Sequence, residues 1–236
     1  MRRPLVISHA ACGGHAPENT LAGIAAALAW GADAIEIDVQ ASADGVPVLM
    51  HDLTVDRSTN GNGAVAELFL EQLRTLDAGG EPVPTLAEVL AETVGRALLV
   101  IEIKQPGIEE EIAAVVRDCG AVNDVMVWSF FPEALESMRR VEPRLPGGLL
   151  VAPGSLSRWP QMRDAVVGSG LQAVSVFFAG VEEGLAGECQ RSGLALYAWT
   201  VDSDREIARL IELGIDGICT NFPDRAIALL EAERRE

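Results

Sequence analysis

Short apolar runs alternate along this chain with longer segments in which apolar residues recur at helical spacing. Short runs of this kind predict strands, and the longer segments predict helices with one apolar side. The first unit places a strand at residues 5–7, a helix at 21–30 that Gly31 ends, and a second strand at 34–39. Because a strand–helix–strand unit brings its two strands together in the same direction, the pattern indicates a parallel sheet.

One apolar run breaks this alternation. The run at 46–51 follows the strand at 34–39 after only six residues, whereas a parallel crossover needs about a dozen or more. We therefore interpret residues 46–51 as the return arm of a hairpin. The following residues, 52–84, are rich in turn-forming residues and contain one helical patch at 68–76. The pattern predicts a small inserted segment after the second strand, over about residues 40–84.

From residue 85 the alternation resumes and continues to the end of the chain. Without the hairpin arm, the sequence predicts eight strands, each followed by a helix, which favours a closed (β/α)8 TIM barrel over an open doubly wound sheet. No linker divides the chain, so we expect one domain over residues 1–236. The remaining strands are expected at 98–104, 124–129, 148–151, 173–177, 195–201 and 217–220, and the helices at 86–93, 108–119, 132–141, 156–167, 182–192, 204–213 and from 224.

Acidic residues outnumber basic ones along the whole chain, since 18 Lys and Arg against 35 Asp and Glu give 18 − 35 = −17. Such a surface argues against nucleic acid and anionic membranes as partners. The four cysteines are far apart and form no zinc-site pattern or disulfide framework, which favours a reducing cytosol. No signal-peptide core or bilayer-spanning run occurs, so we expect a cytoplasmic protein without stable membrane insertion. The pattern does not predict an oligomeric state.

Carboxylates occupy the ends of two apolar strands. Since successive side chains of a strand point to opposite faces, Glu36 and Asp38 share one face of theirs, and Glu102 and Lys104 share one face of the next. A buried carboxylate needs a cation, a proton or strong donors. Strand-end acids can also be exposed or bonded to backbone, but the repeated pattern favours a metal site beside an anion site. Three oxygen ligands without cysteine favour Ca²⁺ or Mg²⁺ over Zn²⁺.

Two of the three histidines lie at predicted strand ends: His9 after the first strand and His51 after the hairpin arm. In TIM barrels the active site lies at the carboxyl-terminal ends of the strands. Because histidine titrates near neutral pH, the pair is suited to general acid and base roles. Lys104 would supply a fixed positive charge for a phosphate. Together these residues indicate metal-assisted displacement at phosphorus.

Together with the acids and histidines above, further segments form an ordered set along the chain: His9, Pro17-Glu18-Asn19-Thr20, Glu36-Ile37-Asp38, His51-Asp52, Thr59-Asn60-Gly61, Glu102-Ile103-Lys104, Trp199-Thr200-Val201, the turn at 214–217 and Phe222-Pro223-Asp224. In this set the chain resembles the glycerophosphodiester phosphodiesterase family over nearly its whole length. The resemblance implies a TIM barrel with a small insertion, and hydrolysis of glycerophosphodiesters to sn-glycerol 3-phosphate and an alcohol. It also implies a divalent ion at Glu36, Asp38 and Glu102, His9 and His51 as the acid–base pair, and phosphate contact by Lys104. The substrate that the resemblance implies is a small-molecule phosphodiester.

The chain departs from this family at two positions. Ala10 stands where the family has an arginine that would help to hold the phosphate, which would cost about ten- to a hundredfold in rate or binding. His15, in the same loop, is a candidate substitute for it or else a solvated loop residue. Asn221 stands where the family often has aspartate, so we expect one negative charge near the site to be absent. Trp199, at a strand end, either packs or forms a wall of the substrate pocket.

Two alternatives remain open from the sequence. One is a related lysophospholipid hydrolase, another phosphodiesterase or a cyclising lyase, which an apolar pocket built from Leu68 and Phe69 of the insertion would favour. The other is a catalytically weak phosphate-ligand binder, which Ala10 favours. The presence of His9 and His51 together argues against the binder, because binding alone does not need an acid–base pair.

Overall fold

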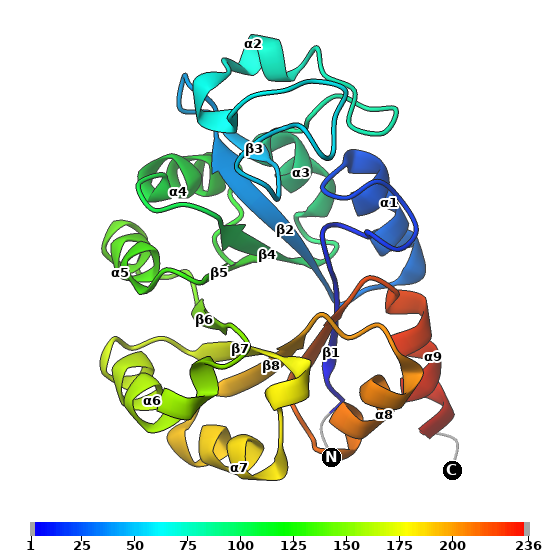
Figure 1. Cartoon of the computed structure of the whole chain (residues 1–236), viewed down its shortest axis with the longest axis vertical. Coiled ribbons are helices and arrows are strands. Elements are labelled where there is room, and N and C mark those ends of the chain that lie inside the picture. Colours follow the sequence, from blue (N-terminus) through cyan, green and yellow to red (C-terminus); the bar gives the residue numbers. More distant parts are fainter. Residues whose placement is uncertain (1–2, 234–236) are drawn as a thin grey trace.

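The computed structural model describes residues 3–233, and in this part of the chain eight parallel strands close into a barrel (Figure 1). Each strand pairs with the next one around the ring, and the first and last strands pair with each other. The predicted (β/α)8 fold is therefore confirmed. The ring consists of β1 (Leu5–Ser8), β2 (Ala34–Ala41), β4 (Leu98–Ile103), β5 (Val125–Ser129), β6 (Gly147–Val151), β7 (Ala173–Phe177), β8 (Ala195–Trp199) and β9 (Gly217–Thr220).

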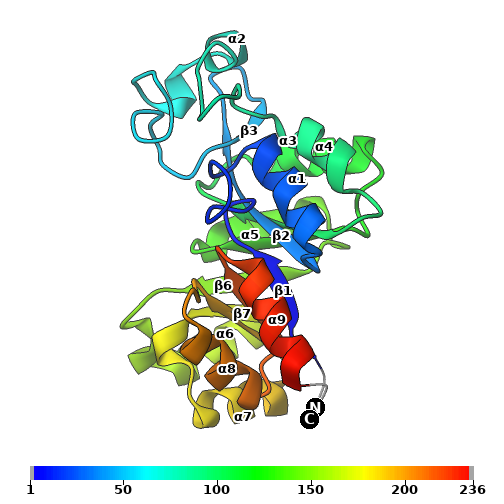
Figure 2. The same cartoon turned by 90° about the vertical axis from the view of Figure 1, so that its right-hand side faces the viewer.

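A helix follows each strand of the ring and lies outside it (Figures 1 and 2). The helix predicted at 156–167 begins at Trp159, because residues 155–158 form a 3-10 turn and Pro160 fits the first turn of a helix. Among the described residues, no helix is long and apolar enough to cross a membrane. The helices are α1 (Leu21–Trp30), α3 (Leu86–Thr93), α4 (Glu109–Asp118), α5 (Pro132–Val141), α6 (Trp159–Gly168), α7 (Glu183–Ser192), α8 (Asp204–Glu212) and α9 (Pro223–Glu233).

The insertion lies between β2 and α3 and projects beyond the barrel (Figures 1 and 2). Its first element, β3 (Pro47–Leu49), pairs antiparallel with the end of β2, as the predicted hairpin requires. Within the helical patch predicted at 68–76, the structure has only the single turn α2 (Leu70–Leu73), and a 3-10 turn, η1 (Val65–Glu67), precedes it. The segment packs around an apolar cluster of its own that includes Val48, Val55 and Leu73. That residues 1–236 form one domain stays a prediction.

The barrel has two apolar layers, and the alternation of side chains along each strand separates them. On β2, Ile35, Ile37 and Val39 face outward and join the core beneath the helices, whereas Ala34 faces inward. Glu36 and Asp38 follow Ala34 at intervals of two and thus also face inward. The inner layer takes one residue from each of the eight strands: Ile7, Ala34, Val100, Trp128, Leu150, Ala173, Tyr197 and Cys219.

Truncating the inner layer should destabilise the barrel. Trp128 is 1 % exposed, and its ring lies 5.3 Å from that of Tyr197. We expect Trp128→Ala to lower the free energy of unfolding by about 3–5 kcal/mol, because the cavity cannot close fully within a ring of strands. Urea unfolding would measure this change. Trp30→Ala, at a tryptophan that is 48 % exposed, is the matched control, and an equal loss in both variants would contradict the expectation.

Candidate active site

Three carboxylates meet at the carboxyl-terminal ends of β2 and β4. These strands are parallel neighbours whose register places Asp38 beside Glu102. Together with Glu36 they form a cluster whose ligand oxygens all lie within 4.8 Å of one another. Glu36 and Asp38 are 2 % and 1 % exposed, and the Glu102 side chain is 12 % exposed. The sequence alone placed these acids on two strand ends, and the register brings them together.

Crowding and burial shift the protonation of this cluster. Burial raises the pKa of Glu36 well above its ordinary value, and the charges of Asp38 and Glu102 raise it further. Burial also raises the pKa of Glu102, and the charge of Asp38 acts in the same direction. Both effects disfavour the charged form, so the cluster is under electrostatic strain that a nearby positive charge relieves.

Lys104 partly supplies that charge. Its Nζ lies 2.8 Å from Glu102 Oε1 and 3.2 Å from Asp38 Oδ1. Burial alone would lower the pKa of Lys104, but the charges of Asp38 and Glu102 outweigh it and raise the pKa. Three carboxylates and one ammonium leave a formal charge of −2 when all are ionised, which is the charge that one divalent cation neutralises.

Backbone and amide donors hold the carboxylates in place. The N–H of Ala10 donates to Glu36 Oε2 at 2.8 Å, and Asn19 Nδ2 donates to Asp38 Oδ2 at 2.7 Å. Both residues have positive φ, 47° for Ala10 and 56° for Asn19, a conformation that asparagine tolerates better than alanine. Thr20 caps α1, whereas Asn19 beside it positions a metal-ligand candidate.

The donor set fits a hard divalent cation. Glu36 Oε1 is fully buried and has no hydrogen-bond partner among the described residues. An orphaned carboxylate oxygen is costly in a protein interior, and it lies in a cluster whose three members all offer oxygen ligands. Glu36, Asp38 and Glu102 are therefore the residues that would hold such an ion.

His9 follows β1 and is fixed through its Nδ1, which lies 2.9 Å from Asn221 Oδ1. Asn221 in turn donates from Nδ2 to Asp202 Oδ2 at 2.8 Å and from its backbone N–H to Asp202 Oδ1 at 2.9 Å. Residue 221 itself is neutral, as the sequence indicates, but the carboxylate of Asp202 lies behind it in the chain of hydrogen bonds from His9. Sequence reasoning missed Asp202, although Trp199-Thr200-Val201 immediately precedes it.

His51 follows the hairpin arm, and its Nδ1 lies 2.7 Å from Asp52 Oδ1. A hydrogen bond from Met50 N to Asp38 O brings this arm beside the acidic cluster. Hydrogen bonds from Arg57 and from His51 lower the pKa of Asp52 to about 2, so the carboxylate is ionised and accepts the Nδ1 hydrogen. His51 is also close enough to Glu102 for its charge to oppose the raised pKa of that residue.

Arg57 ties this arm to the loop that follows β1. Its Nε donates to Asp52 Oδ2 at 2.5 Å, and its two terminal nitrogens bind both oxygens of Glu18 at 2.5 and 3.0 Å. The paired geometry is the planar recognition that guanidinium favours. Sequence reasoning missed this contact, because nothing local in the sequence links residues 18, 52 and 57.

Trp199 and His15, the two other predicted substrate contacts, differ in their surroundings. Trp199 ends β8, and its indole N–H donates to Ser175 O at 3.0 Å, so the ring offers substrate only an apolar surface. It packs edge-on against Phe130 and Phe177, with ring centroids 5.4 and 5.6 Å away. His15 Nε2 lies 2.7 Å from Asp224 Oδ1. A phosphate contact by His15 and a substrate contact by Trp199 stay predictions.

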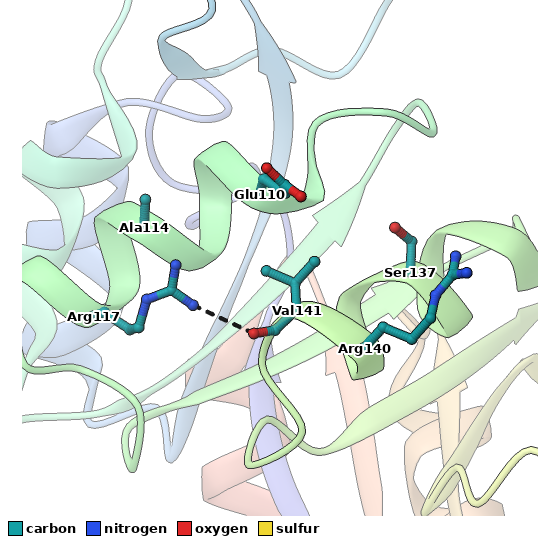
Figure 3. Close-up of a pocket in the computed structure, with 6 residues that line it drawn as sticks. All are labelled: Glu110, Ala114, Arg117, Ser137, Arg140 and Val141. Carbon is teal, nitrogen blue, oxygen red and sulfur yellow. Dashed lines mark hydrogen bonds between the residues drawn. The ribbon is translucent and has the colours of Figure 1, made fainter.

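The cavities of this barrel do not all belong to the site. One of about 720 Å³ lies between α4 and α5, where Arg117 donates to the carbonyl of Val141 (Figure 3). None of the predicted site residues lines it. Another, of about 600 Å³, runs along β6 between α5 and α6 and includes Phe130, the neighbour of Trp199.

A closed parallel barrel with its acidic and basic side chains at the carboxyl-terminal strand ends defines a TIM-barrel enzyme. Residues 9–225 match the model of the Glycerophosphoryl diester phosphodiesterase family. A glycerophosphodiester phosphodiesterase of Caldanaerobacter subterraneus is 36% identical over 97% of this chain and 98% of that protein. The chain belongs to the glycerophosphoryl diester phosphodiesterase family and is an enzyme of that class.

Solved structures agree with this assignment. The glycerophosphodiester phosphodiesterase of Agrobacterium tumefaciens has a TM-score of 0.83 and 30% identity, covering 95% of this chain and 99% of that one. A phosphodiesterase of Oleispira antarctica, solved in complex with the product sn-glycerol-3-phosphate, has a TM-score of 0.84 and 25% identity over 97% of both chains.

The pKa of Asp52 makes a stability prediction. Hydrogen bonds from Arg57 and His51 lower this pKa from 3.8 to about 2 in the folded protein. The Asp52 carboxylate therefore stabilises the fold fully above its pKa in the unfolded chain, and this contribution is lost as the pH falls through its pKa in the folded protein. We expect Asp52→Asn to be less stable than wild type at pH 7, and the difference to shrink from about pH 4 toward pH 2. Urea unfolding across this range measures it.

The control for this measurement is Asp164→Asn, in an ion pair whose carboxylate is 71% exposed. It should change the free energy of unfolding little at any pH, because exposed pairs contribute little. A difference between Asp52→Asn and wild type that stays constant from pH 7 to pH 2 would contradict the assigned network.

Removing one charge from the acidic cluster should separate stability from cation binding. We expect Glu36→Gln to melt at a higher temperature than wild type in the presence of a chelator, because a crowded buried charge is gone. Added Ca²⁺ or Mg²⁺ should raise the melting temperature of wild type but much less that of the variant. Glu109→Gln, at another buried glutamate, is the control and should keep the cation response. Equal responses in wild type and Glu36→Gln would sink the metal assignment.

Proposed function

We propose that this enzyme hydrolyses glycerophosphodiesters to sn-glycerol 3-phosphate and an alcohol in a reaction that depends on a divalent cation, Ca²⁺ or Mg²⁺. The observation that carries this proposal is the cluster of Glu36, Asp38 and Glu102, with its net negative charge and an orphaned buried oxygen, beside His51. Family membership supports the phosphodiester as substrate, and the product bound to the Oleispira relative supports the glycerol phosphate product.

Glu36, Asp38 and Glu102 would hold the cation. When bound, a divalent ion offsets charge on the phosphoryl oxygens and favours ionisation of the nucleophile. The chain itself holds Glu36 through the N–H of Ala10 and Asp38 through the amide of Asn19. Lys104 adds a positive charge fixed between Asp38 and Glu102, and we assign it to the phosphate.

His9 and His51 would share proton transfer. Each is held at Nδ1, His9 by Asn221 and His51 by Asp52, which leaves Nε2 of both rings to exchange a proton with the reacting groups. One histidine takes the proton of the attacking hydroxyl, and the other protonates the leaving alcohol. The nucleophile is water or the neighbouring hydroxyl of the substrate, and the latter would first give a cyclic phosphate.

Trp199 and His15 complete the proposed substrate contacts. Because the indole N–H of Trp199 is already bonded, its ring with those of Phe130 and Phe177 forms an apolar wall suited to the carbon skeleton of the substrate. His15 is assigned to the phosphate as a partial substitute for the arginine absent at Ala10. Its ion pair with Asp224 would have to open for that contact, so unchanged phosphate affinity in His15→Ala would remove it from the site.

The alternatives from the sequence have uneven support. Leu68 packs in the insertion's own cluster and Phe69 is 57% exposed, which adds no support for a lysophospholipid pocket there. The absence of the family's arginine at Ala10 still favours the weak phosphate-ligand binder. A cyclising lyase would use the same histidines. A cytoplasmic location and the absence of nucleic-acid partners stay predictions, and the oligomeric state is open.

The test is release of sn-glycerol 3-phosphate from glycerophosphocholine and glycerophosphoethanolamine with Ca²⁺, with Mg²⁺ and with chelator. We expect cation-dependent release that His9→Ala and His51→Ala each lower by about 10²–10⁴-fold, the usual range for an acid–base residue. Circular dichroism would confirm that the variants fold. Binding of glycerol phosphate without turnover under any of these conditions would favour the binder, and accumulation of a cyclic phosphate would favour the lyase.

A further inference from the structure

Three neighbouring strand ends contribute one hydrogen-bonded chain. His9 follows β1, Asn221 follows β9, and Asp202 lies beyond β8, which pairs with β9. The chain runs from His9 Nδ1 to Asn221 Oδ1 at 2.9 Å, and from Asn221 Nδ2 to Asp202 Oδ2 at 2.8 Å. It ends at the carboxylate of Asp202, and neither of these two hydrogen bonds joins Asp202 directly to His9 or to the acidic cluster.

The orientation of the Asn221 amide is set by its partners. Asp202 accepts hydrogens from the backbone N–H of Asn221, from its Nδ2 and from the hydroxyl of Thr220. An ionised carboxylate carries no hydrogen and can only accept. The amide of Asn221 must therefore turn its NH₂ group toward Asp202 and its oxygen toward His9. An oxygen and a nitrogen of an amide are otherwise hard to tell apart, and here the network decides between them.

The loop after β1 packs closely against Asn221. A Cβ at Gly13 would lie 3.0 Å from Asn221 Oδ1, and one at Gly14 would lie 2.5 Å from Asn221 O. The N–H of Gly14 also donates to that carbonyl at 3.2 Å. Two glycines without side chains thus allow the loop after β1 to close over Asn221 and hold it.

This orientation determines the hydrogen on His9. An amide oxygen only accepts, so Nδ1 of His9 must donate, and neutral His9 carries its hydrogen on Nδ1 with a free lone pair on Nε2. We propose that Asp202 and Asn221 are positioning residues that select this tautomer and so prepare Nε2 of His9 to take a proton. The catalytic use of His9 rests on the proposed function, whereas the tautomer is a property of the folded chain.

The arrangement differs from that of the second histidine. His51 meets a carboxylate directly at Asp52, whereas His9 meets a neutral amide and the carboxylate is one residue further away. The two rings are therefore held by partners of different charge. Exchange of the two residues behind His9 tests the proposed positioning role. In the double variant Asp202→Asn/Asn221→Asp the same chain of hydrogen bonds can form, with the donor and the acceptor between residues 202 and 221 reversed.

The first measurement is ¹⁵N NMR of histidine-labelled protein without substrate, at about pH 8.5, where histidine is ordinarily neutral. The chain has three histidines, and His9→Gln identifies the signals of His9. In wild type we expect His9 as the Nδ1–H form. In Asp202→Asn the residue 202 amide can offer either an oxygen or a nitrogen, so we expect a mixture of both tautomers.

Activity gives the second measurement. We expect Asp202→Asn to lower kcat about 10- to 100-fold with a smaller change in KM, the usual effect of losing an outer partner of a site residue. Asn221→Asp should also lose activity, because two carboxylates would then face each other. The double variant Asp202→Asn/Asn221→Asp should recover at least about tenfold over either single variant and return His9 to the Nδ1–H form.

Thr220→Val is the matched control, because it removes another hydrogen bond to Asp202 but leaves the amide orientation in place. It should lower stability while keeping the Nδ1–H form. A single Nδ1–H tautomer in Asp202→Asn, or a folded double variant without recovery of the tautomer, would overturn the inference. If instead His9→Ala keeps full activity, the proposed catalytic role of His9 fails, and the NMR comparison still decides on the positioning pair.

Discussion

Three carboxylates held within 4.8 Å of one another inside a barrel must be compensated, and much of the chain can be understood as that compensation. Burial and mutual repulsion both oppose the charged forms of Glu36 and Glu102. Lys104, the backbone N–H of Ala10 and the amide of Asn19 contact these carboxylates and hold their oxygens, but they leave the cluster with a net negative charge. The crowding of these carboxylates, which a bound cation would relieve, therefore follows from strand geometry, because side chains two residues apart in a strand share one face.

Local periodicity was sufficient to predict the fold. The apolar runs gave the strands, and the length of each intervening segment separated parallel crossovers from the hairpin at β3. The helix bounds at α1, α3 and α5 agree with the predicted ones because a cap or a proline marks their starts in the sequence. The start of α6 was misplaced, because a 3-10 turn and an α-helix share nearly the same apolar spacing over one turn.

The supporting contacts of the site could not be predicted in this way. Asp202, Asn221 and His9 are far apart in sequence, and only the closing of the ring brings β8, β9 and β1 together. Arg57 likewise joins residues 18 and 52 across a loop without regular structure. The orientation of a side-chain amide depends on its hydrogen-bond partners, so the role of Asn221 can be inferred only once the position of Asp202 is known. The carboxylates themselves were visible early, because acids in an apolar strand conflict with their surroundings.

The insertion with its separate apolar cluster has a consequence for how this barrel can diverge. Its packing involves Val55, Val65 and Leu73 rather than the layers of the ring, while its hairpin arm carries His51 to the strand ends. Sequence change within that small core can therefore reshape the approach to the site without disturbing eight interlocked strands. Residues 42–84 could therefore be exchanged as a unit, provided that the pairing of β3 with β2 and the contacts of Arg57 with Asp52 and Glu18 are kept.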